Sequence, residues 1–170
     1  MAYCTLVLAN TAIADEDTQQ SQWSDSFCGD SGNVTHKELV FNHIKSVEDL
    51  NKEVATASAQ GQSVMLYFYA DWCVSCKEME KKTFSDPRII KVLYNTRLLL
   101  ADITANDHID QTLIQGHFGL PGPPVIIFYN INGQEEKTYR VIGFVPADKF
   151  IDRIRQAIPS LRGRANNYLN

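Results

Sequence analysis

The sequence lacks several features that would place it in other broad classes. No internal repeat or low-complexity tract interrupts it, and no Lys or Arg occurs in the first 36 residues, which carry five of the 20 acidic residues. The 16 basic residues are spread over a nearly neutral remainder. Without a basic stripe, nucleic-acid binding is not expected. What is present, 170 residues with 44% hydrophobic and 10% aromatic content, is typical of one ordinary globular domain.

Cysteine is scarce, yet two of the four cysteines form a Cys73-x-x-Cys76 pair. The pair stands at the junction between the apolar run 63–70 and a helix-forming run. A helix start supplies both the backbone turn that closes so small a disulfide ring and the unpaired N–H groups that favour a thiolate. We therefore predict that Cys73 is a nucleophile and that Cys76, one turn further in, resolves the mixed disulfide formed at Cys73.

Two other interpretations of this pair carry less weight. Tetrahedral zinc needs two further ligands, and the remaining Cys and His residues form no second ligand pair of suitable spacing. No metal site is therefore expected. A purely structural disulfide across three residues would close so short a loop that it would stabilise the fold little.

The N-terminal part of the chain points to export. Residues 1–14 form a mostly apolar leader that ends in Ala12-Ile13-Ala14, a small-x-small pattern that precedes signal-peptidase cuts. The leader has no basic residue and is too short to span a bilayer alone. It is therefore a degenerate signal, a signal that starts upstream, or the end of a membrane helix. A cytoplasmic protein is the alternative.

Residues 15–37 are rich in Asp, Gln, Ser and Gly, which predicts a flexible acidic linker. Cys28 lies within this linker and has no evident partner, so we expect an exposed thiol there. The linker leads into a predicted domain over residues 38–160, and residues 161–170 form a C-terminal tail.

The order of hydrophobic patterns in residues 38–160 predicts an α/β domain. Strands are expected over 39–44, 63–70 and 97–104, and a hairpin of 125–129 with 139–144 is expected around Asn132-Gly133. Helices are expected from the Ser46-Val-Glu-Asp49 capping signal to about Gly61, after Cys73, after Asp86-Pro87, over 106–118 and over 146–158.

This order, with CxxC after the first central strand and a proline before the third, resembles the thioredoxin fold. Over about residues 41–157 the chain resembles, more narrowly, the C-terminal periplasmic domain of the thiol:disulfide interchange protein DsbD. The resemblance rests on the motifs Tyr69-Ala-Asp-Trp-Cys-Val-Ser-Cys-Lys-Glu78, Thr83-Phe-Ser-Asp-Pro87, Ile103-Thr-Ala-Asn-Asp107 and Gly143-Phe144. It implies a thioredoxin fold with a central mixed β-sheet flanked by helices and an N-terminal strand and helix extension.

The resemblance also implies roles for residues around the cysteine pair. Cys73 matches the attacking and Cys76 the resolving cysteine, and Trp72 matches the aromatic residue that flanks them. Pro124 matches the cis-proline of the substrate-binding loop. Glu80 matches an acidic residue of the family that would exchange the proton of Cys76.

Two positions depart from the pattern of the family. Where a buried Asp usually precedes the first cysteine by six residues, this chain has Tyr67, and a phenol is a poor proton acceptor near neutral pH. Pro123 precedes the expected cis-proline and has no N–H, so partner contact there should rely on its carbonyl and on side-chain packing. His108 and His117 are expected on the surface of a helix or at its end, outside the active site.

Together these features predict a monomeric disulfide reductase that works through Cys73 and Cys76 and needs no cofactor beyond their redox-active disulfide. The resemblance implies a membrane-embedded electron donor, a periplasmic thiol-protein acceptor, and a periplasmic location, exported or tethered to the inner membrane. A stand-alone thioredoxin-like oxidase or isomerase, and a redox-inert module that binds peptides with its proline loop, are the alternatives.

Overall fold

The computed structural model describes residues 39–159. The predicted leader, the linker with Cys28, and the tail at 161–170 lie outside the described residues, as do Cys4 and both ends of the predicted domain. In the described part, no helix is long and apolar enough to cross a membrane.

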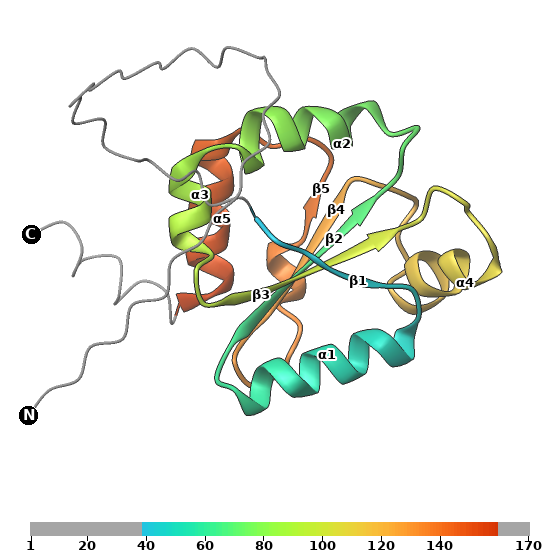
Figure 1. Cartoon of the computed structure of the whole chain (residues 1–170), viewed down its shortest axis with the longest axis horizontal. Helices are drawn as coiled ribbons and strands as arrows, with labels where there is room; N and C mark the ends of the chain where they lie inside the picture. The colour runs from blue at the N-terminus through green and yellow to red at the C-terminus, as the bar shows by residue number, and fades with distance from the viewer. Residues whose placement is uncertain (1–38, 160–170) are drawn as a thin grey trace, which may run out of the picture. The chain divides into compact units, whose positions relative to one another are not determined.

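A five-stranded mixed sheet forms the centre of the domain, as the sequence predicts (Figure 1). Its strand order is β1-β3-β2-β4-β5. The strands β1, β3 and β2 run parallel, whereas β4 is antiparallel to both β2 and β5. In chain order the strands are β1 Asn42–Ile44, β2 Ser63–Tyr69, β3 Thr96–Asp102, β4 Val125–Tyr129 and β5 Val141–Ile142.

Helices cover both faces of this sheet, with α2, α3 and α5 on one face and α1 and α4 on the other (Figure 1). They are α1 Val47–Ala59, α2 Val74–Met79, α3 Pro87–Val92, α4 His108–Gln111 and α5 Ala147–Ala157. Two π-helical segments, η1 Glu80–Phe84 and η2 Thr112–His117, continue α2 and α4, and η3 Lys137–Tyr139 is a 3-10 turn. The predicted N-terminal strand and helix extension is present as β1 and α1.

Local sequence signals start these helices. Ser46 caps α1 through a reciprocal capping box with Asp49, as the sequence predicts. Asp86 caps α3 with Pro87 in the first turn, where a missing N–H has no cost. Asp107 caps α4 in a second capping box.

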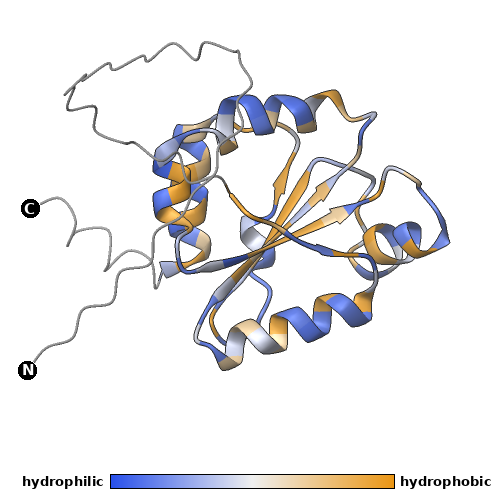
Figure 2. Cartoon of the chain, viewed as in Figure 1, coloured by the Kyte–Doolittle hydropathy of each residue, from blue (hydrophilic) through white to orange (hydrophobic). Residues whose placement is uncertain are grey.

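The core consists of the two central strands and the helix faces that pack on them. All five residues of β4 and the first six of β2 are buried, because helices lie on both faces of the sheet. Figure 2 shows mostly apolar colouring along the central strands, with polar residues on the outer sides of the helices. The buried face of α5 carries Phe150, Ile151 and Ile154.

Three predicted elements differ from the structure. The strand predicted over 39–44 begins only at Asn42, and the helix predicted over 106–118 changes after Gln111 into the wider turn of η2. The predicted hairpin forms its turn at Asn132-Gly133, where Gly133 has a φ of 74°. Its second strand is short, because residues 137–139 form η3 instead.

Thr83 joins the helical layer to the chain that follows β5. Its side chain is fully buried, and its hydroxyl donates a hydrogen bond of 2.7 Å to the carbonyl of Val145. Just before that point, the Gly143 N–H donates to the carbonyl of Pro124 at 2.9 Å. A single hydroxyl therefore helps to hold the segment on which the proline loop rests.

We expect Thr83→Val to lower the free energy of unfolding by about 1–3 kcal/mol, because the Val145 carbonyl loses its partner in a part-buried place. Urea denaturation of the oxidised protein measures the change. Ser85→Ala is the matched control, since the Ser85 hydroxyl bonds only to the Lys81 carbonyl on the exposed side of the same segment. It should change stability by less than about 0.5 kcal/mol. Equal effects of the two substitutions would contradict a specific role for Thr83.

Candidate active site

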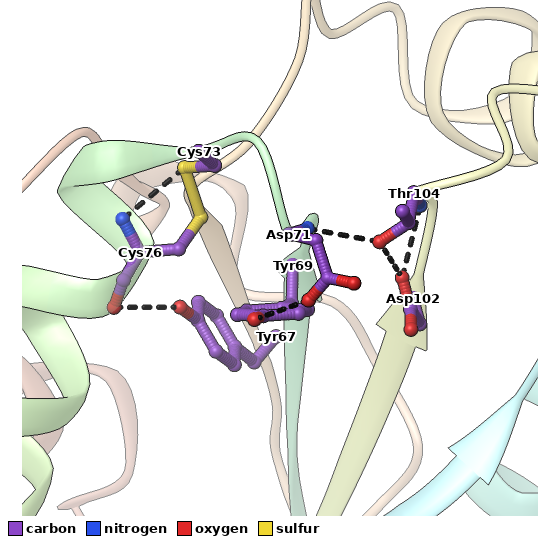
Figure 3. The surroundings of a disulfide bond; sticks show 7 residues. All are labelled: Tyr67, Tyr69, Asp71, Cys73, Cys76, Asp102 and Thr104. Carbon is purple, nitrogen blue, oxygen red and sulfur yellow. Dashed lines mark hydrogen bonds between the residues drawn. A yellow bond between two sulfur atoms is a disulfide. The ribbon is translucent and has the colours of Figure 1, made fainter.

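Cys73 and Cys76 form a disulfide at the N-terminus of α2 (Figure 3). Their Cα atoms are 5.3 Å apart. Cys73 is the N-cap, with an extended backbone, and its sulfur accepts a hydrogen bond of 3.1 Å from the N–H of Cys76. The helix start that the sequence predicts therefore directs a backbone N–H at the first sulfur, an arrangement that stabilises a thiolate there when the bond is reduced.

The two cysteines differ in access to solvent. Cys73 is 7% exposed and Cys76 is fully buried. Exposed apolar residues flank Cys73, the more accessible cysteine: Trp72 is 58% exposed and Val74 is 75% exposed. The geometry therefore allows an incoming sulfur to reach Cys73 but not Cys76.

The proline loop lies at the same edge of the sheet as the disulfide. The peptide bond between Pro123 and Pro124 is cis, the conformation that the resemblance implies. Phe68 near the end of β2 pairs with Val125 at the start of β4. Pro124, which precedes Val125, therefore lies beside the stretch of chain that leads to Cys73. Pro124 is buried, and Pro123 is half-buried.

Tyr67 lies under the disulfide, at the position where the family usually has a buried Asp. Its side chain is fully buried, and its hydroxyl donates a 3.4 Å hydrogen bond to the carbonyl of Cys76 (Figure 3). The ring of Phe84 meets it edge-on, with the centroids 5.1 Å apart. Burial raises the pKa of Tyr67 far above its ordinary value, and the charge of Glu80 adds to this. The phenol therefore remains a neutral donor at any physiological pH.

Glu80 follows Cys76 by one helical turn, and its backbone N–H also donates to the Cys76 carbonyl. The residue is exposed overall, but partial desolvation of its carboxyl raises the pKa of Glu80 above the ordinary value. Lys77 opposes this shift and Asp71 adds to it. Glu80 thus accepts a proton at a higher pH than an ordinary glutamate does.

A second cluster, which the sequence reasoning did not identify, lies on the other side of Cys73. The N–H of Asp71 donates to the hydroxyl of Thr104 at 2.9 Å, and the indole N–H of Trp72 donates to the Thr104 carbonyl at 3.2 Å. Thr104 in turn donates to a carboxylate oxygen of Asp102. The Tyr69 hydroxyl donates to Asp71 at 2.8 Å, which raises the pKa of Tyr69 to about 12.

Thr104 and Asp71 belong to two motifs that carry the resemblance, but neither residue has a chemical signature of its own. Their contact joins positions 33 residues apart, so no local pattern reveals it. The available signal was topological: the carboxyl ends of adjacent parallel strands meet at one edge of a sheet.

No metal centre accompanies these residues. Within residues 39–159, no three His, Cys, Asp or Glu side chains lie close enough to hold a metal ion. His108 and His117 are exposed, and the ring of His117 packs against Phe118 with the centroids 4.6 Å apart. His108 is the first residue of α4 and His117 the last of η2, so both lie at the end of a helical segment, as predicted.

The chain is similar to known proteins of one family. A family model described as thioredoxin-like matches residues 44–130. The thiol:disulfide interchange protein DsbD of Escherichia coli K12 is 46% identical over 125 residues, which is 74% of this chain and 22% of that protein. DsbD of Shigella boydii serotype 4 is 47% identical over the same length. The chain thus spans about a fifth of the length of these curated relatives.

Solved structures narrow the match to one domain of DsbD. The oxidised C-terminal domain of Neisseria meningitidis DsbD is 32% identical, with a TM-score of 0.58, and the match covers 68% of this chain and 99% of that one. The reduced form of the same domain is 34% identical, with a TM-score of 0.59 and the same coverage. A thioredoxin from Thermus thermophilus, 23% identical with a TM-score of 0.55, shares the fold. The chain therefore belongs to the thioredoxin-like family and, within it, to the thiol-disulfide oxidoreductases of the DsbD C-terminal domain type.

Proposed function

We propose that this chain is a disulfide reductase that takes electrons from a membrane-embedded donor and passes them to periplasmic thiol proteins. The observation that carries the proposal is the asymmetry of the pair, in which Cys73 is slightly exposed at a helix N-terminus and Cys76 is fully buried. The relatives that match are thiol:disulfide interchange proteins, which supports exchange chemistry at this pair.

The reaction proceeds in two exchanges. The Cys73 thiolate attacks one sulfur of the partner's disulfide, that bond breaks, and the partner's other sulfur leaves as a thiolate. The Cys76 thiolate then attacks the sulfur of Cys73, breaks the mixed disulfide and releases the second partner thiolate. The partner has gained two electrons and two protons, and the chain is left with the Cys73–Cys76 disulfide that the structure holds. The donor then reduces this bond again.

Proton transfer at the buried cysteine falls to Glu80 in this proposal. Cys76 must lose its proton before it attacks, and Tyr67, the other polar group at its carbonyl, is held neutral by burial. Glu80 has a raised pKa and lies one turn along the helix. An acid–base group poised nearer the working pH exchanges protons more effectively.

Partner contact in this proposal involves Trp72, Pro123 and Pro124. Trp72 supplies exposed apolar surface next to Cys73, and the cis Pro123–Pro124 bond lies at the adjoining loop. Because Pro123 has no N–H, an extended partner segment bonds there to its carbonyl and packs on its ring. Apart from the disulfide the proposed reaction uses no cofactor, and we expect the chain to act as a monomer in the periplasm, free or tethered to the inner membrane.

The roles of the two cysteines predict opposite outcomes for two serine variants. Cys73→Ser should abolish insulin reduction, because no accessible thiolate remains. Cys76→Ser should accumulate a long-lived mixed disulfide with the substrate, because no thiol resolves it. Non-reducing gels and intact mass spectrometry of the trapped species measure both outcomes.

The background for this test is the double variant Cys4→Ser/Cys28→Ser, in which every adduct must involve the active pair. That background should retain full activity, since neither cysteine takes part in the proposed exchange. Adducts on Cys73→Ser but not on Cys76→Ser would reverse the assignment. Mass spectrometry of proteins trapped in the periplasm on Cys76→Ser would identify the natural partners.

If Glu80 accepts the proton of Cys76, the rate of the resolution step should fall at acid pH. Its proton-accepting form is fully present above the raised pKa and is lost as the pH falls through it, so the rate should begin to fall above the ordinary glutamate value of about 4.3. Glu80→Gln should remove this fall at acid pH and slow resolution near neutral pH by about 10²-fold. Stopped-flow measurement of mixed-disulfide decay from pH 4 upward gives both quantities.

Glu78→Gln is the matched control for this experiment. It removes the same charge two residues earlier, where Glu78 pairs with Lys82 on the exposed side of the helix at 2.8 Å. Its profile should overlay that of the wild type. If Glu80→Gln also overlays the wild type, Glu80 has no part in proton transfer.

A further inference from the structure

The loop that follows β3 holds the chain that leads into Cys73. The Thr104 hydroxyl accepts a hydrogen bond from the N–H of Asp71 at 2.9 Å and donates to Asp102 (Figure 3). The Thr104 backbone carbonyl accepts from the indole N–H of Trp72 at 3.2 Å. The Thr104 N–H also donates to Asp102 at 2.9 Å. One threonine therefore joins two consecutive residues of the active-site turn to the end of β3.

This loop is itself fixed at both ends. At its start, Asp102 pairs in register with Tyr69, and the Ile103 N–H donates to the Tyr69 carbonyl at 2.8 Å. At its end, Asp107 caps α4 and forms a 3.0 Å ion pair with Lys45. Thr104 thus belongs to a rigid part of the fold, which it connects to the turn before the disulfide.

This loop restrains the side chain of Trp72. Its ring is 58% exposed, the condition in which a side chain normally samples several rotamers, yet its indole N–H is bonded to this fixed loop. A large apolar surface that is held before a partner arrives loses less conformational entropy on binding. Tryptophan in such a place is also the residue type most often found at the energetic centre of an interface.

We propose that Thr104 is a positioning residue that orients Trp72 for the docking of disulfide-containing protein partners. The proposal rests on the proposed function, since it assumes exchange at Cys73 with a protein substrate. Thr104 takes no part in the chemistry. It acts through Trp72, so its loss weakens recognition of a folded or extended polypeptide and spares reaction with a small disulfide that does not reach Trp72.

The test compares two substrates. Dithiothreitol is the reductant for the protein disulfide, whereas the small disulfide is mixed in a single turnover with pre-reduced protein freed of dithiothreitol, which would reduce it directly. Insulin is the protein disulfide, and 5,5′-dithiobis(2-nitrobenzoate) is the small one. Thr104→Val keeps the shape and the backbone carbonyl that the indole bonds to, but it removes the hydroxyl that holds the Asp71 N–H, next to Trp72. It should raise the KM for insulin about fivefold, the change that loss of one hydrogen bond gives. Its kcat for insulin and its rate with the small disulfide should stay within about twofold of the wild-type values.

Two further variants separate positioning from general damage. Thr104→Ser keeps the hydroxyl and should restore the KM of the wild type. Thr112→Val removes an exposed hydroxyl that bonds only to the His108 carbonyl of its own helix, and it should behave as the wild type does with both substrates. Thermal unfolding of each variant confirms that the protein remains folded.

A double-mutant cycle with Trp72→Phe tests the route of the effect. Thr104→Val acts on Trp72 by releasing the Asp71 N–H, which loosens the Asp71-Trp72 turn against the Thr104 carbonyl. Trp72→Phe already lacks the indole hydrogen bond, so adding Thr104→Val to it should raise the KM for insulin no further. In the single variant Thr104→Val, the indole N–H of Trp72 should exchange with solvent faster by NMR.

Several results would overturn this role of Thr104. One is an equal loss with both substrates, which would place Thr104 in support of Cys73 itself. Others are an unchanged KM for insulin, or a rise that persists in full in the Trp72→Phe background. A wild-type chain that reduces neither substrate would instead refute the proposed function, so the two failures are distinguishable.

Discussion

The pairing of β2 on both of its edges is the constraint on which the site depends. With β3 on one side and β4 on the other, β2 is fixed along its whole length, and three separate segments leave the sheet at the same end. These segments are the turn into Cys73, the loop with Thr104, and the cis Pro123–Pro124 loop. The sulfur chemistry therefore lies on a rigid base, although every residue that does the work is in a loop or at a helix start.

Tyr67 shows how the interior under the disulfide remains free of charge. A carboxylate buried there would need a paired cation or several donors to offset its desolvation, and the described neighbours of Tyr67 are mostly the aromatic rings of Phe41, Tyr69 and Phe84. A phenol fills the same space with an apolar ring and a single hydroxyl, which donates to the Cys76 carbonyl. The site thereby gains packing and gives up an internal base, and Glu80 at the surface of the helix is left as the ionisable group beside Cys76.

Local patterns were sufficient for much of this fold and for the core of the site. The apolar run of β2, the Ser46 cap and the CxxC at a helix start each rest on neighbours in sequence, and the structure agrees with all three. The switch of the helix after Gln111 to a wider turn was not predicted, because apolar spacing does not distinguish the two geometries over one turn. The role of Thr104 was missed for another reason: it depends on which strands are neighbours, and that information is in the topology alone.

The low exposure of Cys73 has a consequence for selectivity. With Cys73 only 7% exposed, its sulfur presents little surface to a partner's thiolate or disulfide, so a productive encounter requires close apposition of the surrounding surface. That surface consists of exposed apolar side chains, Trp72 and Val74, beside a backbone loop with one donor missing at Pro123. Exchange rates with different proteins should thus follow how well each partner covers this rim, more than the intrinsic reactivity of the thiolate. In the proposed function, rigid placement of the rim by β2, β3 and the Thr104 loop determines which partners the Cys73 sulfur meets.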